Sequence, residues 1–157
     1  TGWRVGYAAG PTNVINAMNK VQSQNVSSTA SISMAASVEA LTGDQSFITS
    51  HNESFLRRRD LVVKNLNETP GLSCRVPEGA FYVFASCKGV LGKKTESGKI
   101  IESDGDFMDY LLEEVGVAGV QGSAFGLDGF FRISYATSDS ILEDACQRIK
   151  LACSKLS

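Results

Sequence analysis

The spacing of apolar residues divides the first third of the chain into a strand followed by two helices. Residues 3–8 form a short apolar run that ends before Gly10-Pro11, which predicts a strand. Apolar residues then recur at helical spacing between Val14 and Val21. Small apolar residues fill 29–42, which predicts a closely packed helix with Gly43 as its C′ residue. This part of the chain therefore reads as a strand that leads into helices.

The longest helical pattern covers residues 45–67, with Asp44 as its predicted N-cap. Its length suits a helix that connects two domains. One side of this helix is expected to be apolar, formed by Phe55, Leu56, Val62, Val63 and Leu66. Charges four residues apart predict two ion pairs along it, Glu53 with Arg57 and Asp60 with Lys64. We interpret the run Arg57-Arg58-Arg59 as a solvated helix face rather than a ligand site.

Beyond Pro70-Gly71 the pattern changes to short strands separated by turns and helices. Residues 80–85 are almost continuously apolar, which predicts a strand buried on both faces, whereas the polar residues 88–102 predict an exposed loop. Ser103 and Asp106 resemble a capping box for a helix that Gly116 closes. Further elements are expected as strands at 117–120 and 130–136, and as a helix after Ser138 with Leu142, Ala145, Ile149 and Ala152 on one stripe. The fold class is therefore α/β.

Composition and charge exclude several kinds of partner. The 157 residues are 43% apolar and 20% charged, enough for one sizeable core. The net charge is −2 and the basic residues are scattered, so neither nucleic acid nor a membrane surface is an expected partner. No apolar run reaches the roughly 18 residues of a membrane span, and the N-terminus lacks a signal-peptide pattern. We expect a cytoplasmic protein.

Cysteine and histidine spacing argues against a metal site. The four cysteines form no C-x-x-C pair, and His51 has no neighbour at ligand spacing, so neither zinc nor a disulfide framework is expected. Cys146 and Cys153 lie seven residues apart on a helical pattern and are interpreted as small buried hydrophobes. The stretch Gly92-Lys93-Lys94-Thr95 does not meet the spacing of a phosphate-binding loop.

Two arginines interrupt apolar strand patterns. Strand alternation at 130–135 puts Phe131, Ile133 and Tyr135 on one face and leaves Arg132 on the other, among apolar neighbours. A guanidinium in such a place needs either an internal ion pair or a carboxylate ligand, which its planar fork matches with two hydrogen bonds. Arg4 stands beside glycines near the start of the chain, where it is either a phosphate contact or a surface charge.

Four ordered segments resemble a known enzyme family, namely TGWRVGYAAGP (1–11), PEGAFYVF (77–84), GVAGVQGSAFG (116–126) and FRISYATS (131–138). They are similar to the C-terminal portion of class I, fold type I pyridoxal-phosphate-dependent aminotransferases, and among these to bacterial-type aspartate aminotransferases. The resemblance implies that residues 1–43 end a large cofactor-binding domain, that 44–68 form an interdomain helix and that 69–157 form a small C-terminal domain.

The resemblance also implies roles for the two arginines. Arg4 would contact the 5′-phosphate of pyridoxal phosphate, and Arg132 would bind the α-carboxylate of the amino-acid substrate. The lysine that forms the Schiff base with the cofactor would lie just before Thr1, so no catalytic residue is assigned within this chain. We therefore expect a fragment that is inactive alone and whose full-length form is a homodimer.

Substrate and reaction type remain open at this level. The motifs favour aspartate with 2-oxoglutarate, and prephenate or an aromatic amino acid is the alternative. Phe81 is expected either to line the substrate pocket or to be a core aromatic residue. Two other hypotheses are a fragment of a fold type I pyridoxal-phosphate lyase or synthase, and a non-catalytic module that binds carboxylates or a partner protein through Arg132.

Overall fold

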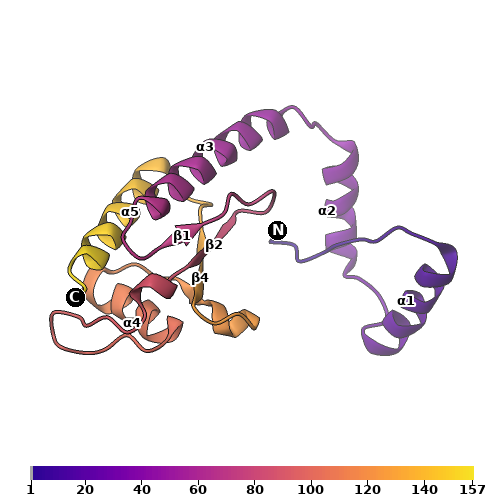
Figure 1. Ribbon diagram of the computed structural model, residues 1–157. Helices are drawn as coiled ribbons and strands as arrows, with labels where there is room; N and C mark the ends of the chain where they lie inside the picture. The colour runs from indigo at the N-terminus through magenta and orange to yellow at the C-terminus, as the bar shows by residue number, and fades with distance from the viewer. Residues whose placement is uncertain (1) are drawn as a thin grey trace. The chain divides into compact units, whose positions relative to one another are not determined.

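The computed structural model describes residues 2–157, and the chain forms two compact units, Thr1–Ile48 and Thr49–Ser157 (Figure 1). The first unit holds the helices α1 (Thr12–Asn25) and α2 (Ser31–Thr42). Helix α3 (Phe47–Asn67) begins at the end of this unit and continues into the second. The domain limits expected from the family resemblance, 1–43, 44–68 and 69–157, refer to a full-length protein and stay a prediction.

The strand predicted at residues 3–8 is absent from the described part of the first unit. These residues are irregular, because a strand needs a neighbouring strand to receive its backbone hydrogen bonds and this unit provides none among residues 2–48. One contact ties the segment to α2, where the Ser33 hydroxyl donates to the carbonyl of Trp3 at 3.0 Å. The two helices themselves confirm the helical spacing of the sequence.

The predicted end of α2 before Gly43 is confirmed, whereas the role given to Asp44 as the N-cap of α3 was wrong. Gly43 does follow α2, but its φ of −76° is not left-handed. Glycine is needed there for space instead, because a Cβ atom would lie 2.7 Å from the carbonyl oxygen of Glu39. Asp44 accepts the backbone N–H of Ser46 at 2.9 Å in a local turn, and α3 begins only at Phe47.

The second unit is a two-layer arrangement of one antiparallel sheet and three helices. The sheet has the order β1-β2-β4-β3, and its strands are β1 (Ser73–Cys74), β2 (Tyr82–Ser86), β3 (Val120–Gln121) and β4 (Phe130–Ser134). Side chains from α3, α4 (Asp104–Val115) and α5 (Asp139–Ser154) share one core with alternate residues of β2 and β4. The edge-to-face rings of Phe107 and Phe131, 5.5 Å apart, lie at this helix–sheet contact.

Strand β2 is shorter and less buried than its sequence predicts. It begins at Tyr82, and only Val83 and Ala85 are fully buried, while Tyr82 and Phe84 are half-buried on the opposite face. The apolar run is therefore an ordinary alternating strand, in which one apolar face packs into the helix-covered core and the other lies on the opposite side of the sheet.

The segment 88–102 is more ordered than the exposed loop that was expected. It starts with the 3₁₀ helix η1 (Lys88–Val90), and Val90, Thr95 and Ile101 are buried. Lys94 exchanges two backbone hydrogen bonds with Ser157, which closes the loop against the C-terminus. The sequence did not indicate this order, because the segment is mostly polar and only these three side chains are buried.

The caps of the C-terminal helices were predicted correctly. The Ser103 hydroxyl accepts the N–H of Asp106 at 3.1 Å, and the Asp106 carboxylate accepts the N–H of Ser103 at 3.0 Å. Gly116 ends α4 with a left-handed φ of +66°. Ser138 caps α5, whose inner stripe packs into the core as expected.

Helix α3 packs through its C-terminal half. Val62, Val63 and Leu66 are buried, whereas Leu56 is exposed. The predicted i,i+4 pairs are replaced by other partners: Arg57 pairs with Asp139, and Asp60 pairs with Arg59. None of the helices over residues 2–157 combines the length and the apolar character that crossing a bilayer requires.

Candidate functional site

Arg132 lies at the centre of β4, on the sheet face that the three helices do not cover. Phe131 and Tyr135 point into the core, as the alternation predicts, while Arg132 is half-buried on the other side. Across the sheet, the register pairs Arg132 with Phe84 on β2 and with Val120 on β3. We call this surface, formed by Tyr82, Phe84, Phe130 and Arg132, the aromatic face.

Two aromatic rings contact the guanidinium of Arg132. Its Cζ atom lies 4.4 Å from the ring centroid of Tyr82 and 4.5 Å from that of Phe125. Tyr82 comes from β2, and Phe125 comes from the 3₁₀ helix η2 (Gly122–Phe125), which follows β3. At these separations, the negative faces of the rings stabilise the cation without neutralising it.

The internal ion pair considered for Arg132 is absent among residues 2–157. Within residues 2–157, no carboxylate lies within 4.0 Å of its guanidinium nitrogens, and each of the ion pairs found involves another cation. A half-buried guanidinium that lacks an acidic partner in this part of the chain is suited to bind an anionic ligand. The planar fork favours a carboxylate.

Aromatic contacts continue along the same face. Phe84 meets Phe125 edge to face with centroids 6.1 Å apart, and it stacks on Phe130 at 5.5 Å with an interplanar angle of 6°. The ammonium of Lys88 lies 5.2 Å from the Phe130 ring centroid. The rings of Phe125, Phe84 and Phe130 therefore form a row, with Arg132 at the Phe125 end and Lys88 at the Phe130 end.

The segment that carries Phe125 is fixed by a buried carboxylate. Asp104, at the start of α4, accepts the backbone N–H of Ser123 at 2.7 Å. Burial acts to raise the pKa of Asp104, but hydrogen bonds from the backbone and side chain of Ser123, and from the backbone of Asp104 and Gly129, together hold the pKa below its usual value. Gly126 then turns the chain with a left-handed φ of +79°.

Arg4 lies in the first unit, and its side chain is exposed. Its backbone has a φ of +51°, an unusual conformation for a residue with a Cβ atom. No acidic residue among those described pairs with it. The hydrogen bond from Ser33 to the preceding carbonyl, that of Trp3, anchors this part of the backbone to α2.

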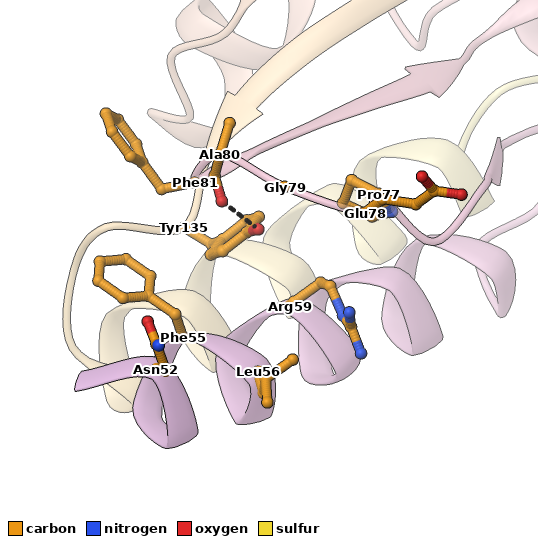
Figure 2. Close-up of a pocket in the computed structure, with 10 residues that line it drawn as sticks. All are labelled: Asn52, Phe55, Leu56, Arg59, Pro77, Glu78, Gly79, Ala80, Phe81 and Tyr135. Atoms are coloured by element: carbon orange, nitrogen blue, oxygen red, sulfur yellow. Dashed lines mark hydrogen bonds between the residues drawn. The ribbon is translucent and has the colours of Figure 1, made fainter. Parts of the chain in front are cut away.

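A separate pocket lies on the helix side of the second unit (Figure 2). It has a volume of about 470 Å³ and lies between the first half of α3 and the segment that leads into β2. Phe55, Phe81 and Tyr135 line it together with Arg59, and the ring centroids of Phe55 and Phe81 are 6.5 Å apart. Arg132 is not part of its lining, so Phe81 is placed in this aromatic cluster and not against Arg132.

The arginine run of α3 is occupied by ion pairs. The Nε atoms of Arg57 and Arg58 each donate to Asp139 at 2.8 Å, and Arg59 pairs with the adjacent Asp60. Asp139 is the first residue of α5, so the two arginines connect α3 with the start of that helix. The run is therefore not the solvated helix face that was expected, since Arg58 and Arg59 are half-buried and Arg59 also lines the pocket of Figure 2.

The four cysteines have the environment of inert core residues. All are buried with free thiols, and burial raises the pKa of Cys146 to about 11 and that of Cys153 to about 12. Over residues 2–157, no group of three His, Cys, Asp or Glu side chains is arranged to hold a metal ion.

Tyr82 and Phe125 were missed as site residues by the sequence. The alternation along 82–86 could have placed Tyr82 beside Arg132, since the two lie diagonally across adjacent strands. Phe125 carries no such signal, because it reaches Arg132 from a short turn between glycines.

Comparison with known proteins identifies the family of the chain. The sequence profile of the family described as "Aminotransferase class I and II" matches residues 1–149. The aspartate aminotransferase of Rhizobium meliloti strain 1021 is 62% identical over 157 residues, which is 100% of this chain and 38% of that protein. The aspartate/prephenate aminotransferase of Cereibacter sphaeroides is 53% identical and is matched over 39% of its length.

Solved structures share the fold. An aspartate aminotransferase crystal structure from Rhizobium meliloti has a TM-score of 0.87 and 62% identity, over 99% of this chain and 39% of that one. The Thermus thermophilus aspartate aminotransferase with maleate has a TM-score of 0.78 and 37% identity, over 96% of this chain and 37% of that one. The chain thus spans about two fifths of the length of these relatives. On its sequence and on its α/β fold, it belongs to the class I and II aminotransferase family.

Proposed function

We propose that the protein containing this chain transfers an amino group from aspartate, or a related amino acid, to 2-oxoglutarate with pyridoxal phosphate as its cofactor. The observation that carries the proposal is Arg132: a charged guanidinium held by two rings and unpaired with any acidic group among residues 2–157. It stands in a chain that is 62% identical to a protein named aspartate aminotransferase.

In this proposal, Arg132 binds the α-carboxylate of the substrate. Its two parallel N–H groups form a bidentate pair with the two carboxylate oxygens, which fixes both the position and the orientation of the amino acid. Orientation matters because the Cα–H bond must take one direction before its proton can be removed. Every α-amino acid and every 2-oxo acid has this carboxylate, so Arg132 serves both halves of the reaction.

Arg4 holds the 5′-phosphate of pyridoxal phosphate in the same proposal. The residue fits that group because its guanidinium is exposed and lacks an acidic partner within residues 2–157, and because α2 anchors the backbone next to it. When bound, the cofactor supplies the electron-withdrawing ring that such chemistry needs. The lysine that binds it is proposed to lie outside this chain.

Further properties of the whole protein follow from the family and are proposed with it. We propose a cytoplasmic homodimer in which 1–43 belong to the large domain, 44–68 link the domains and 69–157 form the small domain. Prephenate is a proposed second oxo-acid acceptor, since the relative from Cereibacter sphaeroides is named for both substrates. Sedimentation equilibrium of the full-length protein tests the dimer.

The activity is tested on the full-length protein with its cofactor. Wild type is expected to convert aspartate and 2-oxoglutarate to the corresponding oxo acid and glutamate, measured by chromatography of the products. Arg132→Ala should raise KM for aspartate and for 2-oxoglutarate at least tenfold, because both lose the same charged contact. Arg75→Ala, which removes an exposed arginine of the same unit, should change neither.

Distinct results would overturn the proposal. Elimination or cyclisation products would identify a lyase or synthase. If no amino acid is turned over, the hypothesis of a non-catalytic carboxylate-binding module would be favoured instead. Unchanged KM values in Arg132→Ala would remove the role given to that residue.

The role of Arg4 has its own test. Arg4→Ala should weaken retention of pyridoxal phosphate during dialysis, by about tenfold in Kd if one charged hydrogen bond is lost. Lys20→Ala is the matched control for an exposed cation in the same unit. Equal retention by wild type and Arg4→Ala would contradict the assignment.

A further inference from the structure

Phe125 is an aromatic residue that the core does not explain. Its side chain is 49% exposed, and it lies outside the buried cluster that joins the helices to the sheet. Its ring nevertheless has two defined contacts, the Cζ atom of Arg132 at 4.5 Å and the edge-to-face ring of Phe84 at 6.1 Å. The position of this ring is therefore defined by the guanidinium and by Phe84, and not by the core between the helices and the sheet.

The backbone around Phe125 is built with little freedom. The N–H of Gly126 donates to the carbonyl of Ser123 at 3.0 Å, and that of Leu127 donates to Gly122 at 3.1 Å. A Cβ atom on Gly122 would lie 2.8 Å from the carbonyl oxygen of Phe130, so the turn is pressed against β4. Together with the carboxylate of Asp104, these contacts fix where the Phe125 ring can lie.

The geometry restricts how Arg132 can receive a ligand. All five N–H groups of a guanidinium point outward in its own plane, whereas its two faces carry no donors. The rings of Tyr82 and Phe125, centred 4.4 and 4.5 Å from Cζ, therefore limit how the guanidinium can move without occupying its donors in hydrogen bonds.

We propose that Phe125 is a positioning residue. Together with Tyr82 on β2, it sets the plane in which the guanidinium of Arg132 binds the substrate carboxylate. The proposal rests on the proposed function, in which Arg132 binds that carboxylate. It assigns to the turn 122–126 a part in substrate binding, although Phe125 acts through Arg132 and not on the reacting atoms.

The test uses the full-length protein with its cofactor and maleate, a dicarboxylate that does not react, as the probe in isothermal titration calorimetry. Phe125→Leu keeps an apolar side chain but loses the ring, and it should weaken maleate binding about tenfold. Phe125→Tyr keeps the ring and should bind like wild type. Leu127→Ala, a change at another exposed apolar residue of the same loop, should also bind like wild type. Phe125→Met is the second variant if Phe125→Leu does not fold.

A double-mutant cycle separates positioning from a general structural effect. In an Arg132→Lys background, Phe125→Leu should weaken binding less than twofold, because an ammonium has no plane to hold. In steady-state kinetics, Phe125→Leu should raise KM for aspartate and 2-oxoglutarate more than it lowers kcat, and Phe125→Tyr should restore both.

The two hypotheses fail in different ways. If Arg132→Ala leaves maleate binding unchanged, the carboxylate role of Arg132 is wrong, and the positioning role falls with it. If Arg132→Ala weakens binding but Phe125→Leu and Phe125→Met do not, the proposed function stands and the inference about Phe125 is overturned. A loss of equal size in the Arg132→Lys background would also overturn it, since the ring would then act independently of the guanidinium.

Discussion

The phenol of Tyr135 donates a hydrogen bond to the carbonyl oxygen of Ala80 at 2.9 Å (Figure 2). Tyr135 follows β4 and its side chain is buried, while Ala80 lies just before β2 with a left-handed φ of +61°. The backbone N–H of Tyr135 also donates to the carbonyl of Phe81, at 2.9 Å. Two hydrogen bonds from one residue thus hold the strained approach to β2, the strand that carries Tyr82.

Removing the Tyr135 hydroxyl should destabilise the fold. Tyr135→Phe keeps the ring but leaves the Ala80 carbonyl without its donor, and we expect the free energy of unfolding to fall by about 1 kcal/mol. Urea denaturation of the chain followed by circular dichroism measures this. Tyr7→Phe, at an exposed tyrosine, is the control and should have no effect. Equal midpoints for wild type and Tyr135→Phe would show that the hydrogen bond contributes nothing.

Glycine at position 80 should stabilise the protein. Alanine in the left-handed region costs roughly 1–2 kcal/mol, and Ala80→Gly removes that cost while adding backbone entropy to the unfolded chain. The net expectation is a rise of up to about 1 kcal/mol in the free energy of unfolding. Ala85→Gly, in the buried middle of β2, should instead lower it by about 1 kcal/mol or more. A loss of stability in Ala80→Gly would contradict the conformation described here.

The capping box of α4 gives a third prediction. Ser103→Ala removes the acceptor for the Asp106 N–H and should lower the free energy of unfolding by about 1 kcal/mol. Ser154→Ala, at the exposed last residue of α5, should change the free energy of unfolding by only a few tenths of a kcal/mol. Comparable losses in both variants would mean that the box is not what stabilises the start of α4.

The thiols should be unreactive while the chain is folded. Burial raises the pKa of Cys74, Cys87 and Cys146 to about 11 and that of Cys153 to about 12. At pH 8, the thiolate fraction of such groups is about 100-fold or more below that of an exposed cysteine with a pKa near 8.5. Alkylation of the native chain by iodoacetamide, followed by intact mass, should therefore be at least about 100-fold slower than alkylation in 8 M urea. Rapid labelling of the native chain would show that the cysteines are not buried.

The link between α3 and α5 should be sensitive to acid and to salt. Hydrogen bonds from Arg57, and next from Arg58, hold the pKa of Asp139 below its usual value. A carboxyl whose folded-state pKa is lowered stabilises the protein above its unfolded-state pKa, near 3.9, and this contribution disappears as the pH falls through the folded value. Asp139→Asn should therefore lower the urea midpoint at pH 7 but not at pH 2.

Salt and a matched variant complete this test. The difference between wild type and Asp139→Asn should shrink in 1 M NaCl, because the pairs with Arg57 and Arg58 are partly exposed and are screened. Asp109→Asn, at an exposed aspartate on α4, should leave the midpoint unchanged at both pH values. A difference that persists at pH 2 would assign the effect to helix capping by the side chain rather than to the charge.

Local patterns were sufficient for the elements whose signals lie within a few residues. The capping box at Ser103, the left-handed Gly116 and the cap at Ser138 were all readable, because each depends on contacts within one turn. The outward direction of Arg132 was readable too, since strand alternation has a fixed period. Both ion pairs expected on α3 were wrong. Arg57 pairs with Asp139 on α5, which no local rule can identify, and Asp60 pairs with its neighbour Arg59.

Local sequence patterns were enough to identify the family, the order of the longer elements from β2 to α5 and the unusual position of Arg132 in a strand, whereas β1 was not expected and the strand expected at 117–120 lies at Val120–Gln121. The surroundings of that guanidinium, Tyr82 from β2 and Phe125 from η2, became visible only in the folded chain. The tertiary structure also decided that residues 3–8 form no strand in this chain, whatever their composition. The physical reason is the same in both cases: aromatic contacts and strand hydrogen bonds join residues far apart in the sequence, and local propensity does not specify the partner.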